Sequence, residues 1–451
     1  MAERDRPSLD VLARAALDEA RGDEAVEAYA EEGRRTEVSA LRGEVEGITV
    51  AESRGVGVRV IRDARLGYAW VADPSLEEVR AAVRRARENA ELAEPDPANG
   101  LPEPEPAEPL PQLHRPASAR AGTDETVARA LDLEAYATSR DPRVTRVDLV
   151  QVGDAVSAMH VASTSGVDVG YERTDAWCVV VALASDGEET QTGFSFAIGR
   201  GWDEVDPHPV ADEAVERGVR VLGATKPATA RVPVVLDRYA ATAFLGVLAS
   251  VLSAEEVLKG RSPFAGRLGD RLGSELVTIV DDGRILAGPG ACPVDDEGVP
   301  TARTELVAAG VLAGFLHDTY TARRTGGDQR STGNARRGFR SPPSVGATNL
   351  YLDAGPLSLD ELLARAEGGV LIQEVSGVHS GVNPVSGEFS VGATGLRITG
   401  GALGEPLREM TIASTIPEML LGVTGVGSDL RFLSNVGTPS VLIGEMTLAG
   451  R

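Results

Sequence analysis

The sequence has few cysteines and histidines, which restricts the chemistry that it can support. Cys178 and Cys292 are the two cysteines among 451 residues and stand far apart. This excludes a disulfide framework and fits a reducing cytoplasm. No two of the five histidines have the spacing of a helical zinc-binding pair, so a local two-histidine zinc motif is excluded. The histidines are His114, His160, His208, His317 and His379.

An excess of positive charge and long apolar runs are also missing. The 45 basic side chains against 68 acidic ones give a formal net charge of −23. Such a balance argues against a nucleic-acid-binding face and against a basic membrane-surface helix. No run reaches the roughly 18 apolar residues that span a bilayer. The charged start MAERDRPSLD shows no secretory signal. We therefore expect a cytoplasmic protein that binds neither nucleic acid nor membrane.

The length predicts two or three domains of about 150 residues each. Eight of the 26 prolines fall within residues 95–116. This density prevents a helix or a central strand, so the stretch is predicted to be an extended linker or an arm lying on the surface. The predicted units are an N-terminal domain at 1–94, a proline-rich linker at 95–119, a middle domain at 120–226 and a C-terminal domain at 227–451.

Periodic apolar residues predict a mixture of helices and strands. In residues 26–31, Val, Ala and Ala point to one face and Glu, Tyr and Glu to the other, as in a strand. Ser75 and Glu78 have the spacing of a capping box at the start of a helix that ends near residue 93. Ser165-Gly166 is typical of a hairpin turn. The fold class is therefore α+β, with a strand-rich C-terminal domain. Other helices are predicted at 8–22, from about 124, at 209–223, 238–259, 318–325 and 357–367.

Candidate polar sites are weak when taken from the residues alone. The carboxylate pairs Glu255-Glu256, Asp281-Asp282 and Asp295-Asp296 are predicted to lie on exposed faces or in turns, because adjacency does not supply the convergent geometry of acid–base catalysis. The glycine-rich segment 373–395 is more suggestive of binding. Its His379, Asn383 and Glu388 are candidates for lining a substrate groove, and the alternative interpretation is that they are turn and edge residues of a sheet.

Several segments, in the same order along the chain, resemble TldD/PmbA proteins. The N-terminal segments are GEVEGITVAESRGVGVRVI (43–61) and DPSLEEVRAAVRRA (73–86). The C-terminal segments are SPFAGRLGDRLGSELVTIVDDG (262–283), CPVDDEGVPTARTELVAAGVLAGFLHDTYTARRTG (292–326), STGNARR (331–337) and SGVNPVSGEFSVGATGLRITGG (380–401). The resemblance covers nearly the whole chain, with weaker motifs between about 120 and 223.

The resemblance implies a choice between two branches of this family. TldD-type members are zinc peptidases with an H-E-x-x-x-H helix and a later cysteine ligand, whereas TldE (PmbA) members lack these ligands and pair with a TldD-type subunit. Here the motif positions fall on LGVLAS, so that Leu245 and Ser250 take the ligand positions and Gly246 that of the catalytic carboxylate. None of these residues is suited to its role, and the segment 425–450 has no cysteine.

The resemblance thus implies a TldE-type subunit without catalytic or metal-binding residues of its own. We expect it to complete a metallopeptidase that trims small or unfolded peptides, with zinc in a TldD-type partner. One alternative is a regulatory or protein-binding module without a peptidase partner, in line with the family's older label as a modulator of DNA gyrase. Another is a hydrolase with different ligands, such as His317 with Asp318 or His379 with Glu374. Whether the chain is itself an enzyme stays open.

Overall fold

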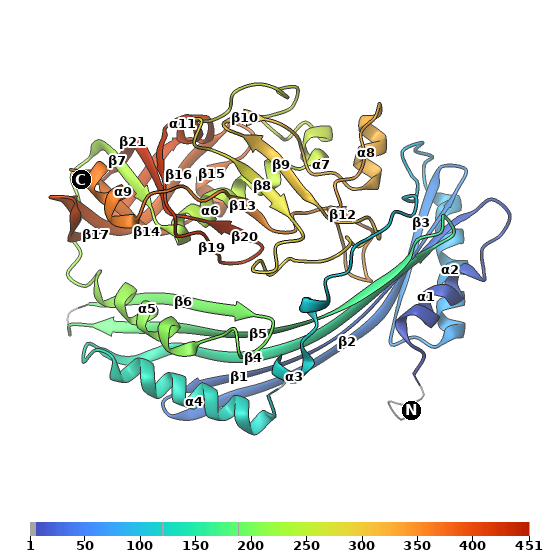
Figure 1. Cartoon of the computed structure of the whole chain (residues 1–451), viewed down its shortest axis with the longest axis horizontal. Helices are drawn as coiled ribbons and strands as arrows, with labels where there is room; N and C mark the ends of the chain where they lie inside the picture. Colours follow the sequence, from blue (N-terminus) through green and yellow to red (C-terminus); the bar gives the residue numbers. More distant parts are fainter. Residues whose placement is uncertain (1–5, 120, 188, 451) are drawn as a thin grey trace.

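The computed structural model describes residues 6–119, 121–187 and 189–450. A long curved sheet with helices on its outer face forms one half of the molecule, and the C-terminal part of the chain lies over its other face (Figure 1). This arrangement confirms the predicted α+β class and the strand-rich C-terminal region. No helix within these ranges is long and apolar enough to cross a membrane.

The curved sheet is antiparallel throughout and contains strands from the first two predicted units. Its central pair is β1 with β4, so one sheet runs across residues 25–199. The predicted domain boundaries stay a prediction. In order across the sheet the strands are β3 (Arg65–Ala72), β2 (Glu44–Arg62), β1 (Ala25–Leu41), β4 (Val144–Ser163), β5 (Asp168–Ser185) and β6 (Thr190–Gly199).

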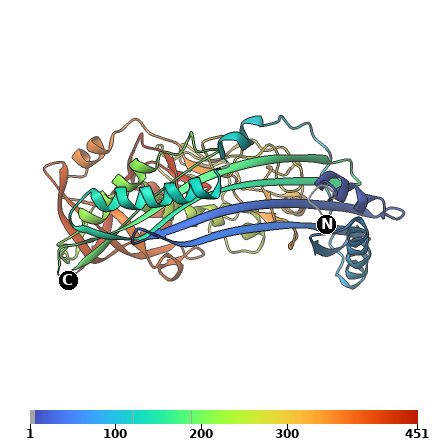
Figure 2. The same ribbon diagram turned by 90° about the horizontal axis from the view of Figure 1, so that it is seen from below.

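The alternation of side chains along β1 determines which residues face each layer. Val26 and Ala28 lie in an apolar core beneath the helices, whereas Glu27 and Tyr29 face the C-terminal half. The predicted capping box of Ser75 is present. Seen from below, α4 lies across the outer face of the strands (Figure 2). The helices of this layer are α1 (Leu9–Leu17), α2 (Leu76–Leu92), α4 (Thr123–Ser139) and α5 (Pro207–Val219).

The proline-rich stretch lies on the surface as an arm. Its Ala98 carbonyl accepts a hydrogen bond from Arg323 (3.1 Å), and its Pro102 carbonyl accepts one from Ser165 in the β4–β5 turn (2.6 Å). The arm therefore contacts both halves of the molecule. Its short helical turns are η2 (Pro111–Leu113) and α3 (Pro116–Ala119).

The C-terminal half contains two larger sheets around a shared apolar core. In the first, the strand order is β10 (Val311–Leu312), β9 (Arg303–Ala308), β8 (Ile279–Asp282), β13 (Leu350–Leu352), β20 (Val436–Thr438) and β19 (Arg431–Phe432). In the second it is β14 (Val370–Ser376), β7 (Ala230–Leu236), β21 (Val441–Ala449), β17 (Ala402–Thr415), β16 (Glu388–Thr399) and β15 (Val382–Asn383). Pairing of β14 with β16 closes five of these strands into a ring. The remaining strands are β18 (Val423–Val426), β11 (Ala335–Arg336) and β12 (Ser344–Val345).

The single helix predicted at 238–259 is wrong, because two helices occupy that stretch. Helix α6 ends at Val251, where the backbones of Leu252 and Ala254 exchange hydrogen bonds with Leu316. The Ser253 hydroxyl then caps α7. Tertiary hydrogen bonds thus break a run whose apolar periodicity continues. The helices of this half are α6 (Arg238–Val251), α7 (Ala254–Leu258), α8 (Thr319–Thr325), α9 (Leu359–Arg365), α10 (Val378–Gly381) and α11 (Ile416–Leu421).

Candidate functional site

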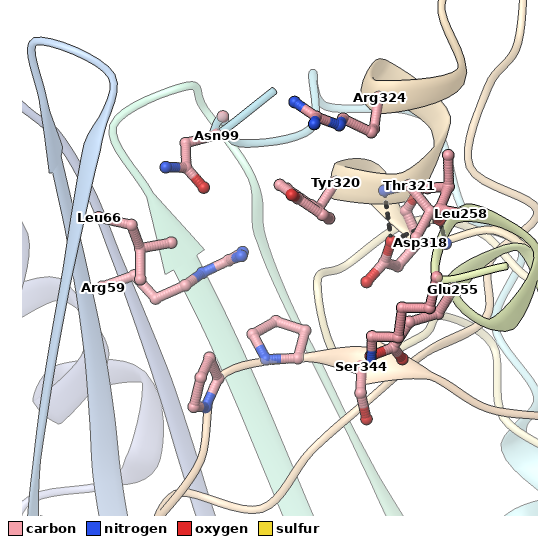
Figure 3. A pocket seen from close by; sticks show the side chains of 14 residues that line it. Arg59, Leu66, Asn99, Glu255, Leu258, Asp318, Tyr320, Thr321, Arg324 and Ser344 are labelled. Atoms are coloured by element: carbon pink, nitrogen blue, oxygen red, sulfur yellow. Dashed lines mark hydrogen bonds and ion pairs between the residues drawn. The ribbon is translucent and has the colours of Figure 1, made fainter. Parts of the chain in front are cut away.

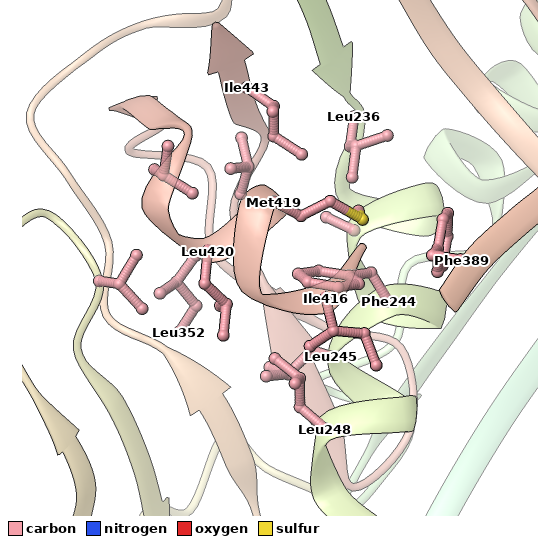
Figure 4. Close-up of a cluster of buried hydrophobic side chains, with 14 of the residues drawn as sticks. Leu236, Phe244, Leu245, Leu248, Leu352, Phe389, Ile416, Met419, Leu420 and Ile443 are labelled. Atoms are coloured by element: carbon pink, nitrogen blue, oxygen red, sulfur yellow. The ribbon is translucent and has the colours of Figure 1, made fainter. Parts of the chain in front are cut away.

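Helix α6 carries Leu245, Gly246 and Ser250, the three residues that the resemblance places at the positions of the zinc motif. The helix forms as predicted at its start, where the Asp237 carboxylate accepts hydrogen bonds from two backbone N–H groups of the first turn. Leu245 is only 3% exposed and packs in the central apolar core. Figure 4 shows it among the apolar side chains of α6 and α11, the latter including Met419. Its side chain therefore serves packing.

The other two motif positions are no better suited to a metal ion. Gly246 has no side chain, and a Cβ placed on it would meet no atom within 4 Å. The Ser250 hydroxyl donates to the carbonyl of Val247 in its own helix (2.9 Å). A protein zinc site needs three or four nitrogen, sulfur or oxygen ligands. In the part of the chain that the structure describes, no three His, Cys, Asp or Glu side chains gather in such a way. The residues of α6 do not fit zinc.

The predicted substrate residues all lie on the exposed surface at one edge of the C-terminal ring. Asn383 on β15 pairs with Glu388 on β16, and His379 lies on the adjoining α10. The Asn383 side-chain oxygen accepts from the backbone N–H groups of Val385 (3.0 Å) and Ser386 (3.1 Å). Asn383 thus has a turn-forming role, as in the alternative interpretation. A role of the three residues in substrate binding stays a prediction.

The alternative ligand pairs have different surroundings. His317 is buried, and among the described residues its Nδ1 has no hydrogen-bond partner. Burial lowers the pKa of His317 to about 4. The neighbouring Asp318 is the N-cap of α8, accepting from the N–H and the hydroxyl of Thr321 at 2.7 Å. Glu374 on β14 is exposed, and partial desolvation of its carboxyl raises its pKa. Whether these residues act in hydrolysis stays a hypothesis.

A buried group of charges, which we call the junction cluster, joins the curved sheet to the C-terminal half. It consists of Glu27 on β1, Arg59 on β2, Glu297 and Arg337. Arg59 donates to both oxygens of Glu27 (2.9 and 2.6 Å) and to Glu297 (2.7 Å). Arg337 lies 2.5 Å from Glu27. The backbone N–H of Thr319, at the start of α8, donates to Glu297 (2.9 Å). The cluster therefore fixes α8 against the sheet.

Mutual pairing keeps the junction cluster charged. Burial disfavours the ionised form of Glu27, but Arg337 and Arg59 outweigh it and hold the pKa of that carboxyl below its usual value. Burial likewise opposes the charge of Arg59, whereas Glu27 and Glu297 raise its pKa above the usual value. Two carboxylates and two guanidinium groups balance each other. Such pairing is the condition under which buried charge is tolerated.

Sequence reasoning did not identify the junction cluster. The prediction that Asp295 and Asp296 lie on an exposed face is wrong, since both side chains are buried. The predicted turn is present, because Asp295 accepts hydrogen bonds from the backbone N–H groups of Glu297 and Val299, both at 2.9 Å. Burial raises the pKa of both carboxyls. The available signal was Glu27 on the polar face of β1, but its partner Arg59 emerges only with the strand register.

A cavity of about 320 Å³ adjoins the junction cluster (Figure 3). Arg59 and Asp318 point into it, and its wall comes from β2, β3, the proline-rich arm, α7, α8 and the start of β12 with the two prolines before it. Such a volume lies at the small end of ligand sites, which run from about 300 to 1,000 Å³. The cavity is lined by Arg59, Leu66, Asn99, Gly100, Glu255, Leu258, Lys259, Asp318, Tyr320, Thr321, Arg324, Pro342, Pro343 and Ser344.

A second hollow, of about 400 Å³, lies on the face of the curved sheet that is turned toward the C-terminal half. Trp177, Val179, Phe196 and Ile198 give it an apolar floor on β5 and β6. The guanidinium of Arg35 lies 4.7 Å from the centre of the Trp177 ring. Apolar surface of this kind, with a few polar groups, suits a peptide with mixed side chains.

Comparison with family models covers most of the chain. Residues 26–90 match PmbA/TldA metallopeptidase domain 1, residues 117–222 match the central domain, and residues 229–450 match the C-terminal domain. The three matches follow one another in the order that the resembling segments predicted.

Individual proteins agree with these matches. A metalloprotease PmbA from Escherichia coli O157:H7 is 26% identical over 92% of this chain and 90% of its own. A metalloprotease from Methanothermobacter thermautotrophicus is 30% identical over 86% of this chain and 85% of its own. The structure of TldE from Thermococcus kodakarensis superposes with a TM-score of 0.88 at 25% identity, and the match covers 97% of this chain and 99% of the TldE chain. A Thermotoga maritima protein described as a modulator of a DNA gyrase superposes with a TM-score of 0.88 at 26% identity, and the match covers 97% of this chain and 98% of that protein. The chain therefore belongs to the PmbA/TldD metallopeptidase family.

Proposed function

We propose that the protein is the TldE-type, non-catalytic subunit of a two-component metallopeptidase. The observation that carries this proposal is the burial of Leu245, at the position of the first zinc ligand, in the core around α6. Helix α6 is present, and the side chain at this position packs in the core. A subunit that serves as a scaffold needs such a helix but no zinc ligand on it. The zinc ion would reside in a TldD-type partner, where it would polarise the scissile carbonyl and activate water.

The substrate in this proposal is a small or unfolded peptide in the cytoplasm. Strand β15 lies at the edge of its sheet, next to His379 and opposite Glu388. An extended peptide pairs with such an edge through main-chain hydrogen bonds that do not depend on its sequence. The apolar hollow around Trp177 offers a second surface for peptide side chains. Both surfaces would help to enclose the peptide beside the partner's zinc.

Reconstitution with the TldD-type homologue of the same organism tests the proposal. Each subunit is purified alone, and cleavage of an unfolded peptide is compared for this chain, the homologue and the mixture. We expect no cleavage by this chain, a rise in activity on mixing and co-elution of the two. A mixture no more active than the homologue alone would contradict the partnership and favour a regulatory module. Stoichiometric zinc with chelator-sensitive cleavage by this chain alone would contradict its non-catalytic role.

The peptide-binding edge has its own test in the active mixture. Glu388→Ala is expected to raise KM for the peptide several-fold with little change in kcat, because it removes an exposed carboxylate that would contact the peptide's side chains beside the edge, outside the catalytic centre. The matched control is Glu88→Ala, a substitution of an exposed residue on α2 in the other half of the molecule. Equal KM values for the two variants would exclude the edge around β15 from the binding surface.

A further inference from the structure

The cavity beside the junction cluster has oppositely charged groups on facing walls. The guanidinium of Arg59 points into it from the curved sheet, and the carboxylate of Asp318 points into it from the start of α8 (Figure 3). Both side chains are more than nine-tenths buried, at 3% and 4% exposure. Charges held this far from water interact strongly with whatever enters the space between them.

Asp318 has one oxygen in use and one available. Its Oδ1 accepts the two hydrogen bonds from Thr321 that cap α8. Its Oδ2 makes no hydrogen bond or ion pair with any residue in the described ranges. Burial and the nearby Glu297 raise the pKa of Asp318, and the hydrogen bonds from Thr321 and the charge of Arg59 only partly offset this rise. A buried carboxylate in this state gains most from a donor that carries positive charge.

Arg59 likewise has donors left over. Its Nε and Nη2 atoms are taken by Glu27 and Glu297. In the described part of the chain, Nη1 has no hydrogen-bond partner, and the guanidinium faces the cavity. A guanidinium offers five N–H donors in a planar fork, so Nη1 remains able to bind a carboxylate oxygen.

The other charged groups at the cavity are already paired. Lys259 forms an ion pair with Glu255 one helical turn away, and Arg324 forms one with Asp96 (3.3 Å). These pairs contribute no net charge. The selectivity of the cavity therefore depends on Arg59 and Asp318.

We propose that this cavity binds a small zwitterion, an α-amino acid or a short peptide, with its ammonium group on Asp318 and its carboxylate on Arg59. An anion alone would face the Asp318 carboxylate, and a cation alone would leave the free Nη1 donor of Arg59 without a partner, so that only a ligand with both groups satisfies both walls. Leu66 and Leu258 provide apolar surface for a ligand side chain, and Tyr320 and Asn99 provide further polar groups. The proposal concerns the isolated chain and does not depend on a peptidase partner.

Calorimetric titration of the isolated full-length chain tests this site. The probes are L-alanine, L-alanyl-L-alanine and tetra-L-alanine, and the probe that binds most tightly reports the length that fits. For that length, the N-acetylated and the C-amidated forms are titrated in parallel. We expect the zwitterion to bind and each blocked form to bind at least tenfold more weakly, because each loses one charged contact. Equal binding of the blocked forms, or no binding of any probe at millimolar concentration, would overturn the proposal.

Two variants separate the site from the general charge of the protein. Asp318→Asn keeps a side chain that can cap α8 and removes the charge, and is expected to weaken binding at least tenfold while thermal unfolding is little changed. The matched control, Asp328→Asn in the exposed loop after α8, is expected to leave binding unchanged. Ser344→Trp, at the exposed end of the cavity wall, is expected to block binding by filling the space. Unaltered binding in Asp318→Asn and Ser344→Trp would show that the probe binds elsewhere.

Discussion

Helix α6 and the junction cluster place opposite kinds of side chain in the interior of one molecule. At the motif position of α6, Leu245 packs against apolar neighbours from α11. At the junction, Arg59 of the curved sheet forms buried ion pairs with Glu27 of the same sheet and with Glu297 of the C-terminal half. The place where family resemblance puts chemistry is apolar, and a place without any recognised motif is densely charged.

The difference teaches that the two regions stabilise the fold in different ways. Fully burying an apolar side chain such as Leu245 contributes about 1.5–3 kcal/mol and involves no titratable group. The junction cluster gains little net stability from its charges, because desolvation offsets most of their attraction, yet removing one member leaves another charge buried alone. The first region tolerates exchange for residues of similar shape, and the second depends on a complete set of partners.

The largest effect is expected from breaking the junction cluster with Glu27→Gln. Arg337 then loses its carboxylate and Arg59 keeps only Glu297. We expect the free energy of unfolding to fall by about 3–5 kcal/mol, as for other buried pairs that lose one partner. Denaturant unfolding followed by tryptophan fluorescence measures the change. The control is Glu44→Gln at the exposed start of β2, with a change within about 0.5 kcal/mol. Similar small losses in both variants would mean that the cluster is hydrated.

Leu245→Ala tests the apolar side of the comparison. Removing this buried side chain is expected to lower the free energy of unfolding by about 2–5 kcal/mol, depending on how far the core collapses around the cavity. Leu421→Ala, whose side chain is 53% exposed at the end of α11, is the control and should cost far less. Equal losses at the two positions, measured by the same unfolding experiment, would contradict the core role of Leu245.

Local patterns predicted these two regions unequally. The face of α6 follows from the spacing of its apolar residues, and the absence of suitable zinc ligands at Leu245 and Ser250 can be stated from the aligned motif. The split of the helix after Val251 could not be predicted, because it arises from backbone hydrogen bonds to Leu316, distant in sequence. The pairing of Arg59 with Glu297 joins residues 238 positions apart. The periodicity of residues along one element does not show which distant residues will pair. The burial of these charges therefore becomes visible only in the tertiary structure.

The pH dependence of stability gives a smaller effect, at the buried His317 just before α8. Burial lowers the pKa of His317 in the folded state to about 4, below the value of about 6.5 for an exposed histidine. Between these values the unfolded chain binds more protons, so the free energy of unfolding falls as the pH drops from 6.5 toward 4. The contribution is about 3 kcal/mol, because one pKa unit corresponds to about 1.4 kcal/mol. His317→Gln should flatten this part of the curve, measured by denaturant unfolding at several pH values. An unchanged slope in the variant would show that His317 titrates as if exposed.

The smallest effect is expected at Ser250, which the family resemblance places at the second ligand position on α6. Its side chain is exposed, and its hydroxyl donates only within its own helix, to Val247. Alanine has the higher helix propensity and leaves no buried polar group unpaired. Ser250→Ala should therefore change the free energy of unfolding by no more than about 0.5 kcal/mol. It should also leave the activity of the reconstituted mixture unchanged. A loss of peptide cleavage in this variant, with stability intact, would show that this position on α6 contributes to peptidase activity. Helix α6 would then not be purely structural, and its contrast with the charged junction cluster would fail.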